Sequence, residues 1–507
     1  MTIQTHFIDE PLLEFGSCQK LEHRQDGLFL YGPVASQGSP GVIHVGIVGT
    51  ADGIQLVTKW LEILMRRLPV ERPEQLHSSP WPGFQAAFGI RLETKPLVTI
   101  PLSSNDISNA IRKTNRHDAV RSAVQLFENA ILEHLRSDDR WPDLWITIVP
   151  EIVHRYGRPQ VGGPKDSTPS TLMSEKAAAE ILRSGGSLFP DMADEAQIYM
   201  FARNFHHQLK AQLLHKEVVI QVVRETTLDP ELELDRFGNP TRSLQERARI
   251  AWNFSTTLYF KGARVQPWQI ADVRPRVCYV GLVFKEDPSP KEQGDACCAA
   301  QMFLNSGNGV VFRGALGPWH SSKSREFHLR REPARDLVTE VIKAYTKDHG
   351  GPPAELFIHG RQRFKDEEWD GFASAVSPET KLVGVRIRPT QDLRLFRADT
   401  DMPVLRGTSV TMSRKEGYLW TTGYVPRIRT YPGFETPKPL LIEMNRGDGD
   451  LVTIMRDVLA LTKINYNACD YASGLPVTLK FADRVGEILT ASPRGLEAPP
   501  MPFRFYI

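Results

Sequence analysis

The stretch LWITIVP, residues 144–150, is an apolar strand candidate that Pro150 brings to an end. A run of this kind is buried on both faces, which is typical of a parallel sheet covered by helices. A second apolar run, residues 42–48, ends at Gly49-Thr50 and precedes an amphipathic stretch at 54–67. Buried strands that alternate with helices predict a doubly wound α/β organisation for the first half of the chain.

The rest of the first half follows the same alternation. Asp26-Gly27 opens a predicted strand at 28–33, and a Gly, Pro and Ser-rich segment at 155–193 predicts a loop. The sequence Ser243 to Glu246 has the pattern of a capping box, which predicts a helix start. The further elements expected here are helices at 122–135, 175–182, 195–215 and 244–261 and a strand at 218–223.

The second half predicts a different sheet. A buried strand at 277–284 is followed by a β-rich stretch to 314, and helices and strands then alternate to the end of the chain. Antiparallel hairpins followed by α/β units suit a ribonuclease-H-like sheet. Pro267-Trp268 marks the expected seam, so we expect a first domain at 1–268, including a lead-in strand, and a second at 269–507. The later elements expected are helices at 333–347, 367–375, 450–461 and 481–489 and strands at 355–359, 382–387 and 440–444.

Composition restricts the kind of nucleic-acid site that this chain can carry. The 507 residues have a net charge of only +2, so the surface as a whole is not a polycation. Phosphate binding then requires a local concentration of Lys and Arg. The five cysteines form no CxxC pair and no leader sequence is recognisable, which favours reduced thiols in a cytoplasmic protein. No apolar run approaches the roughly 20 residues of a membrane span, so no membrane association is expected.

Four residues form the main candidate binding site. His206 and Lys210 are four apart and share one face of the helix expected there. Gln221 lies in the next strand, and Lys261 ends the following helix. A terminal phosphate needs N–H donors and cations that converge from several elements. The alternative is that each is an ordinary surface residue, and that the apolar end of the chain, Ile507, is a frayed terminus.

Taken together, His206, Lys210, Gln221 and Lys261 resemble the H/Y-K-Q-K motif of the MID domain of Argonaute and Piwi proteins. In that family the motif holds the 5′-phosphate of a guide strand. The tail Phe505-Tyr506-Ile507 is similar to that of prokaryotic Argonautes, in which the terminal carboxylate helps to hold a divalent cation. The resemblance implies that Ile507 and Gln221 hold Mg²⁺ on the guide phosphate, a hard cation bridged through oxygen ligands.

Several further segments carry the resemblance along the chain. DGLFLYGP at 26–33 looks like the opening of the MID–PIWI part of short prokaryotic Argonautes, and residues 461–467 and 476–482 resemble its closing segment. ACCAAQMFL at 296–304 and the turn at 317–319 are similar to Argonautes that act with a TIR-APAZ partner. The resemblance implies a Rossmann-like MID domain followed by a ribonuclease-H-like PIWI domain, with the N-terminal and PAZ domains of long Argonautes missing.

The same resemblance implies a PIWI domain that does not cut. Active PIWI domains use acidic residues to hold two metal ions on the scissile phosphate. Where those residues are expected, this chain has Gly281-Leu282-Val283 and Gly360-Arg361-Gln362, and only Asp483 remains. We therefore assign no catalytic residues. The other acidic side chains of this region are expected to be helix-start and surface charges: Asp366, Glu367, Glu368 and Glu443.

The leading hypothesis is a guide-binding scaffold without enzymatic activity of its own. It would take a 5′-phosphorylated guide RNA, recognise complementary single-stranded DNA, and activate an APAZ-domain effector bound as a heterodimer. The effector, a TIR or Sir2 domain that hydrolyses NAD(P)⁺, would act in defence against invading DNA, and a higher oligomer on target binding stays open. Two alternatives remain: a guided nuclease with unrecognised carboxylates, and a protein–protein module with a vestigial pocket. The sequence leaves the guide chemistry and the effector class undecided.

Overall fold

The computed structural model describes residues 3–34, 40–72, 78–184, 189–241, 245–286, 296–303, 309–316, 319–321, 326–431, 433, 435–492 and 501–507. For residues 286, 296–303, 309–316 and 319–321 it describes the backbone alone.

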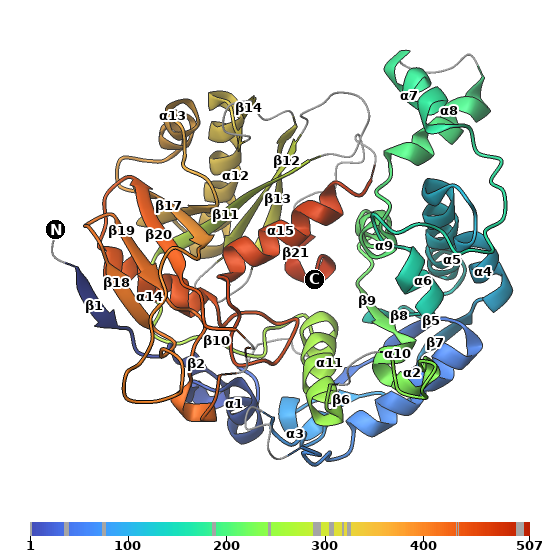
Figure 1. Ribbon diagram of the computed structural model, residues 1–507, viewed down its shortest axis with the longest axis horizontal. Coiled ribbons are helices and arrows are strands. Elements are labelled where there is room, and N and C mark those ends of the chain that lie inside the picture. The colour runs from blue at the N-terminus through green and yellow to red at the C-terminus, as the bar shows by residue number, and fades with distance from the viewer. Residues whose placement is uncertain are drawn as a thin grey trace.

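The first sheet has four parallel strands, as the alternation predicts. Its order is β7 (Val98–Pro101), β5 (Val45–Gly49), β8 (Leu144–Val149) and β9 (Ile220–Arg224). All six residues of β8 are buried, because helices cover both faces of the sheet. One face packs on α2 (Ala51–Leu64) and α11 (Arg247–Gly262), and the other on α4 (Ser104–Ile111), α5 (Arg116–Ser137) and α9 (Phe205–Leu214). Figure 1 shows this domain on the right.

The second sheet has ten strands. Their order is β1 (Gln4–Phe7), β18 (Thr408–Thr411), β19 (Glu416–Leu419), β20 (Leu440–Arg446), β17 (Lys381–Pro389), β16 (Glu355–Gly360), β11 (Val277–Glu286), β12 (Ala296–Phe303), β13 (Gly309–Leu316) and β21 (Met501–Pro502). Strands β11, β16 and β17 are parallel and their outer neighbours antiparallel, which is the pairing expected of a ribonuclease-H-like sheet.

Helices cover both faces of this second sheet. One face packs on α12 (Arg331–His349) and α13 (Asp366–Ala375), and the other on α14 (Leu451–Leu461) and α15 (Val477–Leu489). The core on the α14 and α15 side is continuous with the core under α11. The two domains are therefore joined by buried apolar side chains. Within the described ranges, no helix combines the length and the apolar character needed to cross a bilayer.

The lead-in segment differs from its prediction. Residues 28–33 are not a strand, since α1 (Arg24–Tyr31) occupies this stretch, with His23 as its N-cap and Gly32 at φ 70° after its end. The prediction failed because a short apolar run is compatible with either a strand or a helix. The segment also belongs with the second sheet: β1 pairs with β18, and the buried guanidinium of Arg24 donates to the carbonyls of Thr462 and Lys463.

Two helix boundaries also differ. The helix expected at 195–215 is broken into α8 (Pro190–Gln197), a short 3-10 turn and α9, because Asn204 caps a new start. The helix expected from the capping box begins later, at Arg247, with Glu246 as its N-cap. Ser243 and Leu244 lie outside the described residues. The break before α9 places His206 in the first turn of its helix.

Candidate functional site

The start of α9 supplies the first part of the site. The side chain of Asn204 accepts a hydrogen bond from the backbone N–H of His207 at 3.2 Å, which fixes the first turn. His206 and Lys210 follow on one face of the helix, and the positive end of the helix dipole lies at this terminus. Lys210 is 4% exposed, and its Nζ donates to the carbonyl oxygen of Tyr506 at 2.9 Å. The helix is thereby joined to the end of the chain.

Strand β9 and helix α11 supply the second part. Lys261 is fully buried near the end of α11, and its Nζ donates to the carbonyl of Ile220 at 2.9 Å and to Oε1 of Gln221 at 2.8 Å. The amide nitrogen of Gln221 donates to the carbonyl of Val222 at 3.2 Å. These contacts orient the amide oxygen of Gln221 toward the lysine. The structure therefore brings Gln221 and Lys261 into direct contact.

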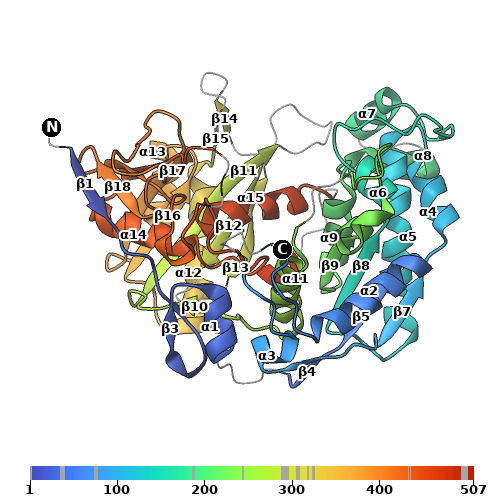
Figure 2. The same cartoon turned by 60° about the horizontal axis from the view of Figure 1, so that its bottom comes forward.

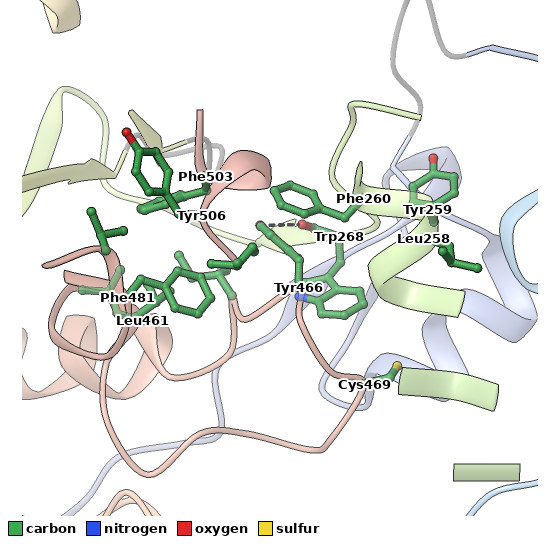
Figure 3. Packing of buried hydrophobic residues seen from close by; sticks show 14 of the residues in the cluster. Leu258, Tyr259, Phe260, Trp268, Leu461, Tyr466, Cys469, Phe481, Phe503 and Tyr506 are labelled. Carbon is green, nitrogen blue, oxygen red and sulfur yellow. Dashed lines mark hydrogen bonds between the residues drawn. The ribbon is translucent and has the colours of Figure 1, made fainter. Parts of the chain in front are cut away.

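The chain terminus closes the site. Ile507 is 3% exposed, and its backbone N–H donates to the carbonyl of Phe503 at 3.1 Å. Phe503 packs edge-on against Phe481 of α15 at 5.4 Å between ring centroids, and Figure 3 shows Phe503 and Tyr506 within the same apolar cluster. Figure 2 shows the C-terminus between α15 and α11, on the side facing α9. The terminus is packed and not frayed.

The electrostatics of the site are set mainly by burial, which disfavours the charged forms of its basic groups. Burial, with a smaller contribution from the charge of Arg484, lowers the pKa of Lys210 from 10.5 to about 7. Burial and the charge of Lys210 together hold the pKa of Lys261 well below its ordinary value. The pKa of His206 is likewise well below its usual range, through burial and then through Lys210. An anion that binds beside these groups would favour their charged forms and raise their pKa values.

The sequence reasoning missed two members of the site. The charge of Arg484, on α15, contributes to lowering the pKa values of His206 and Lys210, so a cation of the second domain lies near the candidate residues of the first. His207 is the other, with a pKa lowered to about 4 mainly by burial. The adjacent histidines were visible in the sequence, but nothing local showed which face of α15 turns toward α9.

A cavity adjoins the start of α9. Its volume is about 580 Å³, within the range of small-molecule and nucleotide sites. It opens at the carboxyl ends of β8 and β9, beside His206 and His207, and Arg158 and Arg224 also line it. Arg224 is paired with Glu151 at 2.6 Å. Of the four candidate residues, His206 lines this cavity, whereas Lys210 and Lys261 are buried and do not line it.

The positions expected for nuclease carboxylates come together at a different place. Gly281 lies against the start of α15, where an added Cβ would sit 1.9 Å from the carbonyl oxygen of Thr478. Arg361, at the end of β16, contacts Asp483 of α15 at 3.5 Å. Two acidic residues expected at the surface are in fact buried: Glu368 is 1% exposed beside His328, and Glu443 is 8% exposed. Among the described residues, no group of three His, Cys, Asp or Glu side chains is placed to hold a metal ion.

Comparison with known proteins places the fold. No protein-family model matches the sequence, and no curated protein matches it significantly. Solved structures do match. Clostridium butyricum Argonaute, bound to a guide DNA and a 19-mer target DNA, has a TM-score of 0.62 and 13% identity over 98% of this chain and 54% of its own.

Two further Argonaute-type structures agree. The A. aeolicus Argonaute has a TM-score of 0.54 at 13% identity over 98% of this chain and 54% of its own, and Drosophila Piwi has 0.57 at 12% over 99% and 56%. The chain spans about half the length of these proteins. At such low identity the likeness concerns the fold alone, and it confirms the predicted arrangement of a Rossmann-like domain followed by a ribonuclease-H-like domain.

Proposed function

We propose that this chain is a short Argonaute that anchors the 5′-phosphate of a guide strand, RNA by preference, and pairs that guide with single-stranded target DNA. The observation that carries the proposal is that Lys210 bonds to the buried tail of the chain and lies near Lys261, whose pKa it helps to lower. The pKa values of His206, Lys210 and Lys261 are lowered there, mainly by burial, and an arriving anion would favour their charged forms. A phosphate dianion is an anion of this kind.

A divalent cation fits the same pocket once the phosphate is bound. Gln221 presents its amide oxygen there, and Ile507 brings the terminal carboxylate, both of them ligand types that Mg²⁺ accepts. The crowding of cations in the guide-free pocket opposes a further positive charge, so we expect Mg²⁺ to bind only together with the phosphate. Bound there, the ion would neutralise the charge of the phosphate and the terminal carboxylate.

Guide binding is tested with matched oligonucleotides that carry a 5′-phosphate or a 5′-hydroxyl. Wild-type protein should prefer the phosphate, and Lys210→Ala and Lys261→Ala should each lose a few kcal/mol of that preference, as expected for a charge-assisted contact. RNA and DNA versions of the same guide decide the guide chemistry. Equal affinity for the two 5′ ends in wild-type protein would refute the proposal.

We further propose that the chain does not cleave the target. The support is that Asp483, the carboxylate left where a nuclease would need several, is engaged by Lys285 at 2.8 Å and by Arg361. Incubation of guide-loaded protein with complementary DNA and Mn²⁺ should leave the DNA intact. A product cut at one position opposite the guide would instead support the guided-nuclease alternative.

The proposed partner is an APAZ-domain effector of TIR or Sir2 type that forms a heterodimer with this chain. Its support is the sequence resemblance. Co-expression with such an effector should give a stable complex that hydrolyses NAD(P)⁺ only with guide and target present. A complex that is equally active without target would contradict the proposed signalling, and size measurements before and after target addition would show any higher oligomer.

A further inference from the structure

Another cavity lies at the carboxyl ends of the parallel strands of the four-stranded sheet. Its volume is about 480 Å³. Thr50 follows β5, Pro150 follows β8 and Glu225 follows β9, and all three residues line the cavity. The chain passes from β5 to β7 on one side and then returns to β8 on the other side of β5. Open α/β sheets bind their ligands in the crevice at such a reversal of strand order.

Contacts between neighbouring elements hold the walls of this cavity in place. Thr50 is the N-cap of α2, and its hydroxyl donates to Oε1 of Glu225 at 2.9 Å. Helix α10 (Glu225–Leu228) is joined to α2, because the indole N–H of Trp60 donates to the carbonyl of Leu228 at 2.7 Å. Figure 1 shows α10 beside α2 at the lower right. The cavity is therefore built between packed elements of the first domain.

The lining of this cavity carries an excess of negative charge. Asp52, Glu225 and Asp229 contribute three carboxylates, against the single cation of Lys59 among the described lining residues. Within the described part of the chain, Asp52 and Glu225 take part in no ion pair. The pKa of Glu225 is raised by burial, and the nearby charges of Asp52 and Glu151 act in the same direction. A cation that binds here would favour the charged carboxylates. We call this space the acidic cavity.

The remaining walls of the acidic cavity favour an organic cation over a metal ion. No three His, Cys, Asp or Glu side chains of the described residues are placed to hold a metal ion. The volume also far exceeds that of a single ion, and methylene groups are stabilised when they leave water for an aliphatic wall. The aliphatic lining residues are Leu56, Ile107, Pro150, Ile152 and Leu232.

The charge of the acidic cavity distinguishes it from the cavity beside His206. Arg224 lines that cavity, whereas the next residue, Glu225, lines the acidic one. Helix α6 (Glu151–Tyr156) contributes to both walls, with Ile152 in the acidic cavity and His154 in the other. One edge of the sheet thus presents a cationic cavity and an acidic cavity side by side. A phosphate is repelled by the second, and a cation is attracted to it.

We infer that the acidic cavity binds a linear aliphatic polyamine. Its ammonium groups would donate to the half-buried carboxylate of Glu225 and to the carboxylates of Asp52 and Asp229, while its methylene segments lie on the aliphatic walls. Hydrogen bonds between ammonium and carboxylate groups are charge-assisted and stronger than neutral ones. They outweigh the repulsion from Lys59 and from the positive end of the α2 dipole, because three carboxylates face one lysine. The inference does not depend on guide binding.

The test measures binding of spermidine to the full chain without guide by isothermal titration calorimetry. It is done at about 0.15 M NaCl, which screens exposed charges beyond about 8 Å. The variant Asp52→Asn/Glu225→Gln removes two charges and keeps the shapes of both side chains. Its matched control is Asp336→Asn/Glu340→Gln, which removes two exposed carboxylates of α12. The variant Ser104→Lys adds a cation at an exposed position of the lining and leaves the native carboxylates in place.

We expect one spermidine to bind per chain. The dissociation constant should rise at least about 10-fold in Asp52→Asn/Glu225→Gln and in Ser104→Lys, as expected for losing or opposing a charge-assisted contact, and should stay within about twofold in the control. Absence of saturable binding to wild type would overturn the inference. Equal dissociation constants for wild type and both cavity variants would overturn it too.

Butylamine separates a polyamine from a lysine side chain of another protein, because it presents the single ammonium group and the alkyl stem of lysine. It should bind much more weakly than spermidine, and equal affinity would overturn the assignment to a polyamine. Binding of 5′-phosphorylated guide is measured on the same proteins and should not change in the cavity variants. Failure of wild type to bind that guide would overturn the proposed function and leave this inference standing.

Discussion

Lys210 provides a direct test of the proposed guide site. This lysine should destabilise the guide-free protein and stabilise the protein bound to 5′-phosphorylated guide. Its side chain is 4% exposed and its pKa is lowered from 10.5 to about 7. Since one pKa unit corresponds to about 1.4 kcal/mol, keeping this lysine buried costs on the order of 4 kcal/mol at pH 7. Lys210→Met removes this cost, but it leaves the carbonyl of Tyr506 without its donor, worth roughly 1–3 kcal/mol.

We therefore expect the guide-free Lys210→Met variant to be more stable than wild type at pH 7 by roughly 1–3 kcal/mol. For a chain of this size, this corresponds to a Tm higher by a few degrees. The unfolded state of wild type binds more protons than the folded state between pH 7 and 10.5, so wild-type stability from this group rises with pH in that window. The advantage of the variant should accordingly shrink by about 2 kcal/mol between pH 7 and pH 9.

With 5′-phosphorylated guide bound, wild type should be more stable than Lys210→Met. A bound phosphate keeps Lys210 protonated, so Lys210→Met loses a charge-assisted contact and binds 5′-phosphorylated guide roughly 10- to 100-fold more weakly. Affinity of wild type for that guide should also fall as pH rises above about 7, because binding then requires proton uptake by Lys210.

The assay is thermal unfolding at pH 7 and pH 9, with no guide, with 5′-hydroxyl guide and with 5′-phosphorylated guide. Lys216→Met is the matched control, since Lys216 is exposed just beyond α9 and should change little. The reasoning is refuted if guide-free Lys210→Met melts below wild type at pH 7 while retaining full preference for the phosphorylated guide.

Three further predictions concern other contacts. A Ser-Gly-Ser extension after Ile507 should weaken binding of phosphorylated guide at least about 10-fold, because it displaces the buried terminal carboxylate. The same extension at the N-terminus should leave the affinity unchanged. Equal dissociation constants for the two extended proteins would contradict the role of the carboxylate. Arg24→Met should destabilise the chain by roughly 1–3 kcal/mol for each buried carbonyl of the loop after α14 that loses its donor, and a change below about 1 kcal/mol in denaturant unfolding would show that these bonds contribute little. Gly281→Ala should cost about 3 kcal/mol or more because of its contact with the Thr478 carbonyl. Gly351→Ala, which meets no atom of the described residues within 4 Å, should be tolerated, and similar unfolding midpoints for both variants would refute the packing argument.

The sequence alone predicted the elements whose composition supports the apolar pattern. The strand at 144–149 formed where expected, because its run is rich in β-branched residues and ends at Pro150, and the helix ending near Lys261 formed with a later start. The stretch 28–33 was assigned wrongly, since a short run carries too few residues to distinguish a period of 2 from one of 3.6. Asn204 was the missed local signal, a helix cap inside what read as one helix.

For the candidate site too, some features could be predicted from the sequence and others only from the tertiary structure. Residues His206, Lys210, Gln221 and Lys261 could be chosen from the sequence, because together they resemble the H/Y-K-Q-K motif of Argonaute and Piwi MID domains. Only the tertiary structure decided that Tyr506 accepts from Lys210, that Arg484 adds its charge, and that cations surround Asp483. These contacts join residues up to 296 positions apart, and no local pattern states which face of α15 or which turn of the tail will pack there. The packing of α15 and of the tail is determined by the apolar core that the two domains share.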